Sequence, residues 1–223
     1  QALELLKEDP RSSKQAQSRL EMETKKQISG WTFKRVVQRS GLIWKRMRGS
    51  LKNRRDQAAF EQAQKELDYL HEREAREELL VYYYDESGVS LTPVIPYGWQ
   101  ASGETEQLPS SRSKRLNILG FYTRNNQFAV TTIEGSVNSE SVIDCFDRFC
   151  AQTEKETVVI VDNASTHTSR AFKARLPIWA NKGMSVKYLP TYSPELNIIE
   201  ILWRFIKYQW LPLSAYQSYK QLK

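Results

Sequence analysis

The chain has 223 residues with 40% hydrophobic residues and a formal net charge of +7, which allows one large domain or a domain with a smaller companion. It has no uninterrupted apolar run of about 18 residues and no signal-peptide pattern, so the sequence excludes a membrane span and predicts no membrane partner. The chain begins at Gln1, inside a helical run without Met, and ends in a polar helical stretch. We interpret it as a fragment that lacks an N-terminal piece and has a trimmed C-terminus.

The positive charge is concentrated near the N-terminus. Residues 1–55 carry 15 Lys and Arg against 5 Asp and Glu, whereas residues 56–80 carry 3 against 8. A basic segment of this kind is typical of a surface that binds a polyanion such as DNA. The alternative is an ordinary solvated surface that happens to be basic.

Residues 12–28 and 32–41 predict two short helices around a Gly-containing turn, the pattern of a helix-turn-helix. Ser29 is placed to cap the second helix, and Gly41 to end it. The buried face of this helix is expected to consist of Phe33, Val36 and Val37.

Polar side chains on the other face of this helix, and in the basic tail after it, are predicted to contact DNA bases or phosphates. These are Thr32, Lys34, Arg35, Gln38, Lys45, Arg46 and Arg48. Residues 1–55 are therefore expected to be a DNA-binding region.

Residues 56–79 predict one long charged helix that connects this region to the rest of the chain. Its apolar residues recur at spacings of three and four. They are Phe60, Ala63, Leu67 and Leu70. The stripe covers barely two heptads, so packing within the chain is favoured over a dimer contact.

From residue 80 the pattern predicts three strands in a meander, followed by alternating helices and strands. The strands are expected at 79–85, 116–123, 127–133, 157–162 and 185–189, and the helices at 138–153, 169–180 and 196–209. This order predicts an α/β domain over residues 80–223, a mixed sheet flanked by helices as in the ribonuclease H-like fold. Cys145 and Cys150 lie five positions apart in one helix and are expected to be reduced, unpaired thiols.

Three carboxylates stand where this fold can bring them together. Asp85 and Asp162 each end an apolar strand, and Glu200 lies on or beside the sheet-facing side of the last helix. Mg²⁺ prefers oxygen ligands, and a pair of such ions serves phosphodiester displacement. We expect these three residues to be catalytic and to hold two Mg²⁺ ions. For any one of them alone a structural role is the alternative, such as a helix cap for Asp162.

Other titratable residues nearby have open interpretations. Glu86 and Glu195 are the rival carboxylates, although Glu86 points to the opposite face of its strand and Glu195 lies in a Ser-Pro turn. His167 either approaches the metals or a phosphate, or satisfies a loop or helix cap. With His71 as the second of two His, and two Cys, a zinc site is not expected.

Two runs, VDNASTHTS and YLPTYSPELNIIEILWRFIK, resemble the catalytic core of mariner-superfamily transposases, particularly their bacterial insertion-sequence branch. Asp85 in YYYDESG matches the family's first carboxylate, and the PYGWQASGE loop, with Gly98, Trp99 and Gly103, is also similar. Two departures are Ile198, where the family usually has Pro, and a longer spacing of 37 residues between Asp162 and Glu200. The resemblance covers nearly the whole chain and is strongest over residues 157–207.

The resemblance implies a DDE transposase that binds terminal inverted repeats, hydrolyses phosphodiesters at the element ends and joins the freed 3′-hydroxyl to target DNA, typically at TA. It implies Mg²⁺, with Mn²⁺ able to substitute, and it places Asn163 and His167 beside the site. The helix-turn-helix matches the second half of the family's bipartite DNA-binding region.

The expected partners are double-stranded DNA and a second copy of the chain, as a homodimer on DNA ends. The expected location is the bacterial cytoplasm, in association with the nucleoid. The alternatives are a catalytically silent DNA-binding protein derived from a transposase, and a structure-specific nuclease of the same fold.

Overall fold

The computed structural model describes residues 1–45, 52–92, 99, 101–103, 105, 107 and 115–223. The chain divides into two compact units, Gln1–Ser50 and Leu51–Lys223. Within the part of the chain described, no helix is both long and apolar enough to cross a membrane.

The first unit consists of three helices, α1 (Ala2–Glu8), α2 (Ser13–Thr24) and α3 (Gly30–Arg39). Hydroxyl caps begin two of them, because Ser12 accepts from the N–H of Gln15 and Ser29 accepts from the N–H of Thr32, both at 3.2 Å. The core of this unit contains Leu5, Leu6, Ala16, Leu20 and Phe33.

Two sequence predictions for this unit are wrong in detail. The helix expected over residues 12–28 ends at Thr24, because Lys25 adopts a left-handed conformation with φ 54°. Val36, expected on the buried face of α3, is 45% exposed, and Phe33 is the residue of this helix that the core encloses.

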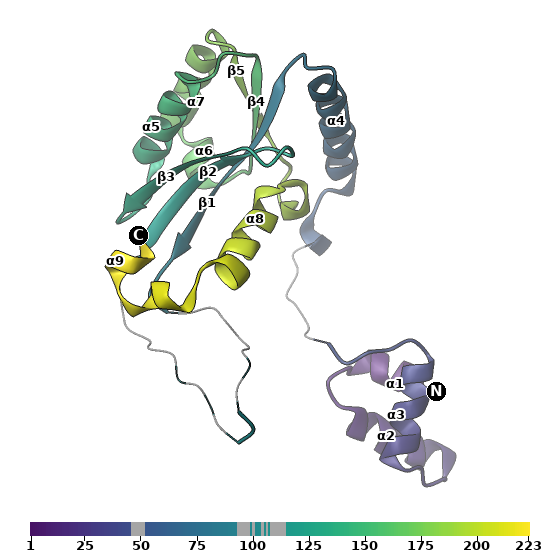
Figure 1. The fold of residues 1–223 in the computed structure, drawn as a ribbon. Helices are drawn as coiled ribbons and strands as arrows, with labels where there is room; N and C mark the ends of the chain where they lie inside the picture. The colour runs from purple at the N-terminus through teal and green to yellow at the C-terminus, as the bar shows by residue number, and fades with distance from the viewer. Residues whose placement is uncertain (46–51, 93–98, 100, 104, 106, 108–114) are drawn as a thin grey trace. The chain divides into compact units, whose positions relative to one another are not determined.

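The second unit is built on a mixed sheet with strand order β3-β2-β1-β4-β5 (Figure 1). The strands are β1 (Leu80–Val89), β2 (Leu116–Tyr122), β3 (Phe128–Glu134), β4 (Thr157–Val161) and β5 (Met184–Tyr188). The first three form an antiparallel meander, and β4 and β5 add in parallel to the other side of β1. The expected α/β fold with a mixed sheet is confirmed.

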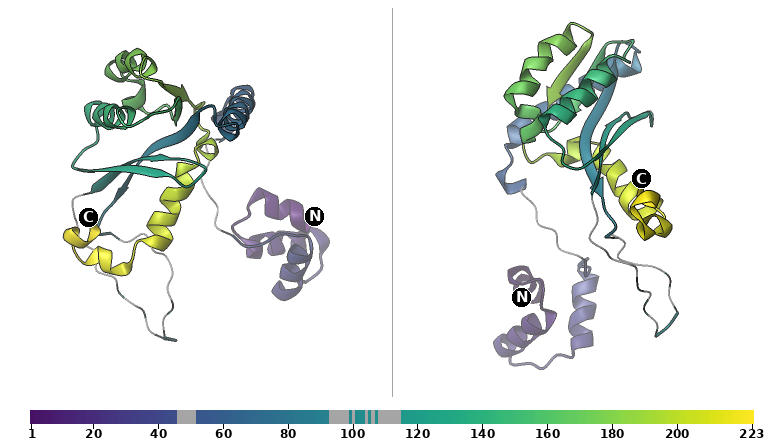
Figure 2. Two further views of the ribbon diagram at one scale, coloured as in Figure 1. Left: turned by 45° about the horizontal axis from the view of Figure 1, so that its top comes forward. Right: turned by 90° about the vertical axis from the view of Figure 1, so that its left-hand side faces the viewer.

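Helices cover both faces of this sheet (Figure 2). On one face, α5 (Ser139–Cys150) and α7 (Arg170–Ala180) enclose an aromatic cluster with Tyr84, Phe121, Phe146, Phe172 and Trp179. On the other face, α4 (Gln57–Ala75) and α8 (Ile199–Phe205) pack against Val81, Tyr83, Val158 and Ile160. The short elements are η1 (Lys52–Arg54), α6 (Ser165–Thr168), η2 (Pro194–Leu196), the π-helical turn η3 (Ile206–Trp210), η4 (Leu213–Gln217) and α9 (Tyr219–Leu222).

The apolar stripe of α4 is used within the chain. Phe60, Ala63 and Leu67 are each no more than 8% exposed and belong to the same core cluster as β1 and α8. This helix therefore packs onto the sheet, as the favoured interpretation of its short stripe predicted. Cys145 and Cys150 are both buried and unpaired, as expected.

Candidate active site

Asp85 lies at the point where β1 changes neighbours. The parallel pairing of β1 with β4 ends at Tyr83 opposite Ile160, whereas its antiparallel pairing with β2 continues to Val89. The prediction that Asp85 ends its strand is therefore wrong, since β1 runs on for four more residues along β2. The carboxylate nevertheless lies two residues beyond Tyr83, the last residue of β1 that pairs with β4.

Two neighbours shape the position of Asp85. Its partner in β2 is Gly120, and the indole N–H of Trp203 in α8 donates to Asp85 Oδ2 at 3.0 Å. This contact of Trp203 was not predicted from the sequence. Its place three residues after Glu200 could have indicated that it reaches the site.

Asp162 follows the last residue of β4 directly, as expected. The N–H of Ala164 donates to its Oδ1 at 3.0 Å, and His167 Nδ1 lies 2.8 Å from the same oxygen. Partial burial opposes ionisation, yet these hydrogen bonds and the His167 charge keep the pKa of Asp162 below its usual value. Because both bonds reach Oδ1, Oδ2 is the oxygen that remains to bind a ligand.

His167 is fully buried and lies between two carboxylates. Its Nδ1 lies 2.8 Å from Asp162, and its Nε2 lies 3.0 Å from Glu86 Oε1. Burial opposes a charge on the ring, but the hydrogen bonds and charges of Asp162 and Glu86 raise the pKa of His167 to about 10. The protonated ring donates to both carboxylates and fixes Asp162.

Glu86 was predicted to point away from Asp85, but its hydrogen bonds connect it to the other candidate carboxylate, Asp162. Its carboxylate is on the same side as the Tyr84 hydroxyl, which donates to it at 3.4 Å. From there it reaches Asp162 through the His167 ring.

Glu200 lies in the first turn of α8, beside the buried face rather than within it. Ile199, Leu202 and Trp203 supply the buried side, and Glu200 itself is exposed. Although the residue is exposed to solvent, protein atoms around its carboxylate displace part of the water there and raise the pKa of Glu200, with the Lys207 charge acting against this and the Asp162 charge adding to it. The negative charges of Glu200 and Asp162 therefore repel each other.

The three carboxylates form one electrostatic group. Burial, then the charges of Glu200 and Glu86, and more weakly that of Asp162, raise the pKa of Asp85 to about 7. Within the described residues, no three His, Cys, Asp or Glu side chains lie close enough together to hold a metal ion. The donor set fits Mg²⁺ or Mn²⁺ in its chemistry, because mutually repelling carboxylate oxygens are the ligands that such ions prefer.

A pocket of about 320 Å³ opens between the end of β4 and the start of α8. It is lined by Asp162, Asn163, Ala164, Leu189, Pro190, Thr191, Tyr192, Ser193, Pro194, Asn197 and Glu200. Asn163 donates its side-chain amide to the Leu189 carbonyl and so closes one wall. Tyr192, which sequence analysis did not single out, has a left-handed backbone with φ 59°, unusual for a bulky residue.

The rival carboxylate Glu195 is tied to basic side chains away from this group. Lys52 Nζ lies 3.0 Å from its Oε1 and Arg55 Nη1 lies 2.5 Å from the same atom. Although burial acts in the opposite direction, its backbone hydrogen bond and these two cations lower the pKa of Glu195 to about 2.

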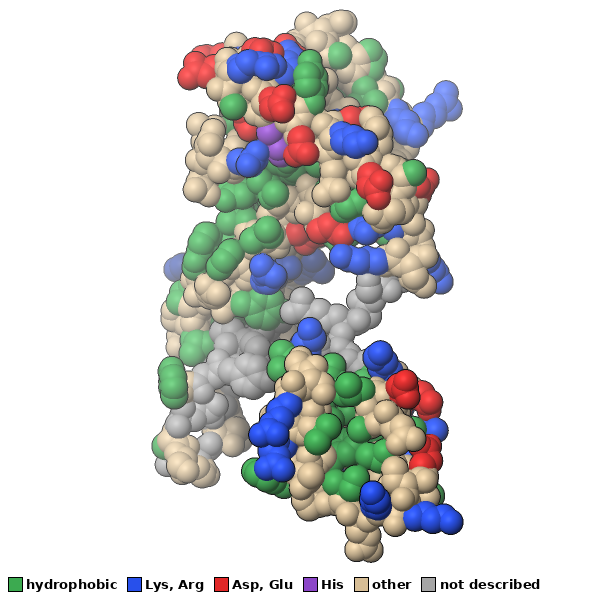
Figure 3. Space-filling model, turned by 90° about the vertical axis from the view of Figure 1, so that its right-hand side faces the viewer, with side chains coloured by type: hydrophobic (Ala, Val, Ile, Leu, Met, Phe, Trp, Pro, Cys, Tyr) green, Lys and Arg blue, Asp and Glu red, His purple; other side chains and the backbone are tan. Residues whose placement is uncertain are grey.

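The predicted DNA-contacting side chains lie on α3 and after it. Lys34, Arg35, Gln38 and Lys45 are exposed, whereas Arg46 and Arg48 lie outside the described residues, as does Gly98. The Thr32 hydroxyl shares a 2.9 Å hydrogen bond with Ser29 Oγ, so it belongs to the helix cap. Figure 3 shows Lys and Arg side chains of this unit alongside hydrophobic ones.

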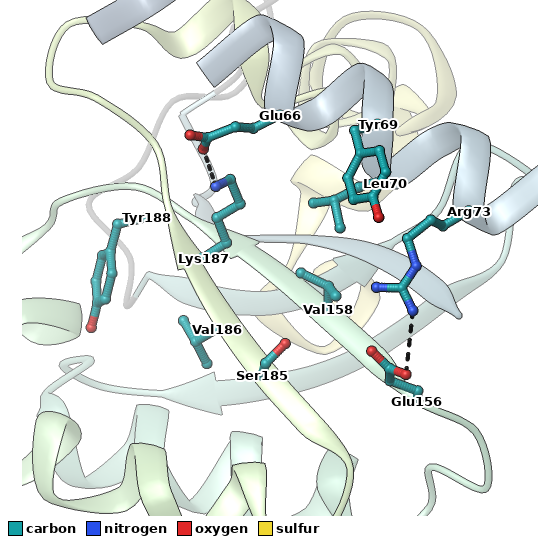
Figure 4. Close-up of a pocket in the computed structure, with 10 residues that line it drawn as sticks. All are labelled: Glu66, Tyr69, Leu70, Arg73, Glu156, Val158, Ser185, Val186, Lys187 and Tyr188. Carbon is teal, nitrogen blue, oxygen red and sulfur yellow. Dashed lines mark hydrogen bonds and ion pairs between the residues drawn. The ribbon is translucent and has the colours of Figure 1, made fainter. Parts of the chain in front are cut away.

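A larger pocket of about 560 Å³ lies between α4 and β5 (Figure 4). The charged side chains on its wall are paired with one another. Glu66 forms an ion pair with Lys187, and Arg73 lies 3.6 Å from Glu156. None of the three candidate carboxylates lines it, so it is not the active-site candidate.

Residues 80–223 match the sequence model of the family described as DDE superfamily endonuclease. The chain is 28% identical over 183 residues to the "Insertion element IS630 uncharacterized 39 kDa protein" of Shigella sonnei, across 80% of this chain and 51% of that protein. The chain thus spans about half the length of this curated relative.

Solved structures of low sequence identity share the fold. The Mos1 strand transfer complex has a TM-score of 0.63 at 17% identity and covers 100% of this chain and 68% of that one. The mariner Mos1 paired end complex with Mg has a TM-score of 0.56 at 19% identity, covering 87% of this chain and 59% of that one. The predicted ribonuclease H-like fold is confirmed.

Proposed function

Because the chain belongs to the DDE superfamily endonuclease family, whose sequence model matches residues 80–223, we propose that it is a DNA transposase. It binds terminal inverted repeats, hydrolyses phosphodiesters at the element ends and transfers the freed 3′ ends to target DNA, in cut-and-paste fashion at TA. The observation that carries this proposal is that Asp162 and Glu200 line one pocket beside the end of β4, while Trp203, in the same helix as Glu200, donates a hydrogen bond to Asp85.

In this proposal Asp85, Asp162 and Glu200 are the catalytic residues and the metal ligands. Two Mg²⁺ ions, or Mn²⁺, supply activation of the attacking hydroxyl and charge neutralisation at the leaving oxygen when bound. The raised pKa of Asp85 and that of Glu200 support this assignment, since burial and neighbouring carboxylates disfavour their charged forms and a bound cation would offset both effects.

Residues around the carboxylates have separate tasks. His167 holds the Asp162 carboxylate through Oδ1 and so fixes the direction of Oδ2. Lys207 is half-buried, and its charge acts on both Glu200 and Asp85. We assign it to the phosphate next to the cleaved bond, because an ammonium group near a carboxylate cluster attracts the DNA backbone there.

Recognition of the element ends is assigned to α3 and the basic segment after it. Lys34, Arg35 and Gln38 are exposed on one helix, whose Ser29 cap and Phe33 anchor fix it within its unit. A recognition helix in the major groove uses such side chains for base edges, and flanking Lys and Arg for phosphates. Base contacts set the sequence preference, and phosphate contacts supply most of the affinity.

The test is cleavage by the full chain of a duplex that carries the ends of its own element, with Mg²⁺ or Mn²⁺. We expect Asp85→Ala, Asp162→Ala and Glu200→Ala each to abolish cleavage while DNA binding survives. Glu195→Ala is the matched control, because it removes a neighbouring carboxylate that is paired with Lys52 and Arg55.

Other outcomes distinguish the alternatives. DNA binding without cleavage by the unmodified chain identifies a catalytically silent DNA-binding protein. Cleavage of branched DNA without strand transfer identifies a structure-specific nuclease. Normal cleavage by Glu200→Ala together with loss in Glu195→Ala shows that the third ligand is wrongly assigned.

A further inference from the structure

Two hydrogen bonds join the segment that carries Glu200 to the strand that carries Asp85. Asn197 Nδ2 donates to the carbonyl of Tyr84 at 3.1 Å, and Trp203 Nε1 donates to Asp85 Oδ2 at 3.0 Å. Asn197 and Trp203 lie three positions before and three after Glu200, and they are only 4% and 3% exposed. Glu200 is thus bracketed by two buried contacts with β1.

The strand next to Asp85 is shaped to receive the indole ring. Gly120 faces Asp85 across β1 and β2, and a Cβ atom at this position would lie 2.8 Å from Trp203 Cη2. Any larger residue would therefore displace the ring or its neighbour Phe128, which packs edge-on against it at 5.9 Å. The absence of a side chain at Gly120 lets the indole N–H reach the carboxylate.

Asn197 makes its contact just beyond the last pair between β1 and β4. Its Oδ1 is buried without a hydrogen-bond partner among the described residues, so within that part of the chain the donated bond to Tyr84 is the amide's polar contact. A buried polar side chain that is only half satisfied is costly, which indicates that its remaining bond has a specific role.

The hydrogen bonds from Asn197 and Trp203 counteract the electrostatic repulsion between Asp85 and Glu200. When both are ionised, the charges of Asp85 and Glu200 repel each other, which disfavours the packing of α8 beside β1 while no cation lies between them. The bonds from Asn197 and Trp203 oppose that repulsion, one on each side of Glu200.

We infer that Asn197 and Trp203 are positioning residues that hold Glu200 in register with Asp85, so that the two carboxylates can share a divalent cation. This inference rests on the proposed function. Partners that orient metal-binding carboxylates typically contribute about 10–100-fold to metal affinity.

The experiment measures Mn²⁺ binding to the full chain by isothermal titration calorimetry. We expect Trp203→Phe, which keeps an aromatic ring but removes the N–H donor, to weaken Mn²⁺ binding by about 10–100-fold. Trp179→Phe is the matched control. Trp179 is 1% exposed and donates its indole N–H to Asp147 Oδ1 at 2.7 Å, on the other face of the sheet, so its loss should leave Mn²⁺ affinity unchanged.

A second pair of variants tests the other anchor. Asn197→Ala should weaken Mn²⁺ binding, whereas Asn117→Ala should not, although Asn117 is also buried and donates its amide to the Gly135 carbonyl. Gly120→Ala should also weaken Mn²⁺ binding, because the added methyl group displaces the indole of Trp203. This variant keeps every hydrogen-bonding group, so it tests the position of the ring alone. These variants decide the question where Trp203→Phe fails to fold.

Nuclear magnetic resonance tests the geometry without metal. The indole N–H signal that disappears in Trp203→Phe should be protected from solvent exchange in the unmodified chain, and it should shift in Asp85→Asn. The signal that disappears in Trp179→Phe should not shift in Asp85→Asn. The inference is overturned if the Trp203 N–H exchanges freely with solvent and its signal does not shift in Asp85→Asn.

The outcomes separate this inference from the proposed function. If the unmodified chain binds no Mn²⁺, both are wrong. If it binds Mn²⁺ and Trp203→Phe and Asn197→Ala bind equally well, only the positioning role is wrong. Equal losses in Trp203→Phe and Trp179→Phe show a general loss of structure and also overturn the positioning role.

Discussion

The buried ring of His167 and the half-exposed carboxylate of Asp162 are joined by a 2.8 Å hydrogen bond, within a segment of six residues. The far side of the ring meets Glu86 at 3.0 Å, so one imidazole links β1 to the loop after β4. The same ring also packs edge-on against Tyr84, with centroids 5.4 Å apart. Removing this side chain therefore affects both strands that border the site.

We expect His167→Ala to lower the free energy of unfolding by about 3–5 kcal/mol, because it leaves the Glu86 carboxylate without its buried cationic partner. Urea unfolding of both proteins near neutral pH measures the difference. Glu86→Gln is the control, since an amide oxygen still accepts from the ring and should cost about 1 kcal/mol. Equal stability of His167→Ala and the unmodified chain contradicts the buried pairing.

The pH dependence of that difference follows from the raised pKa of His167. Its pKa is about 10 in the folded chain and 6.5 in the reference state, so the folded chain binds the proton more tightly. The stabilisation is fully present below about pH 6.5 and is lost as the pH rises toward 10. Urea unfolding at several pH values should show the gap between the unmodified chain and His167→Ala closing over this window.

The ionised side chain of Asp85 should destabilise the metal-free chain near neutral pH, whereas the protonated side chain of His167 stabilises it. The pKa of Asp85 rises from 3.8 to about 7 on folding, so the metal-free chain loses stability as the pH rises through this window. We expect Asp85→Asn to be more stable than the unmodified chain at about pH 8, and the difference to shrink toward about pH 4. Thermal unfolding with chelator measures this, and an unchanged gap contradicts the buried, repelled state of Asp85.

Glu195→Gln should affect stability but not metal binding. The change removes the charge that pairs with Lys52 and Arg55, and Arg55 also stacks over the Phe60 ring at 3.8 Å. We expect a loss of about 1 kcal/mol in the free energy of unfolding, in line with a partly exposed ion pair. Calorimetric Mn²⁺ affinity should stay the same, and a large loss of affinity would make Glu195 the better third ligand.

DNA binding by the first unit should depend steeply on salt, because Lys and Arg release counterions from phosphates. We expect Arg35→Ala or Lys34→Ala to weaken binding to the element end by about 1–3 kcal/mol if the side chain contacts a base. Fluorescence anisotropy across a salt series measures both effects. Lys182→Ala, an exposed change after α7 in the other unit, is the control and should have no effect.

We expect a chain that is monomeric or weakly associating in solution and dimeric on paired DNA ends. The apolar stripe of α4 is occupied by its own sheet, with Phe60, Ala63 and Leu67 no more than 8% exposed, so it is not free for a coiled coil. Sedimentation with and without a terminal-repeat duplex tests this. A tight dimer without DNA, or one chain for every paired-end complex, contradicts it.

Much of the fold follows from local patterns. Continuous apolar runs predicted β1 and β4, and the Ser29 cap and Gly41 predicted α3 closely, because these signals act within a few residues. The end of β1 was missed because it depends on how far β2 pairs along it, a long-range property.

The sequence predicted three candidate carboxylates but not the groups that surround them. The family match agrees with the resemblance that pointed to Asp85, Asp162 and Glu200, whereas their roles stay predictions. The tie between Glu86 and His167 spans 81 positions, and that between Trp203 and Asp85 spans 118. Hydrophobic periodicity indicates which residues of one helix or strand share a face, and it does not indicate contacts between residues so far apart in the sequence.

The bonds from Asn197 and Trp203 to β1 can form only after most of the chain has been synthesised. They connect residues 113 and 118 positions apart, and contacts this distant in sequence form late. A growing or prematurely terminated chain that ends before Asn197 can build the strands but lacks Glu200 and both anchors. Because α8 carries Glu200 and Trp203, the proposed site can form only after this helix has been synthesised.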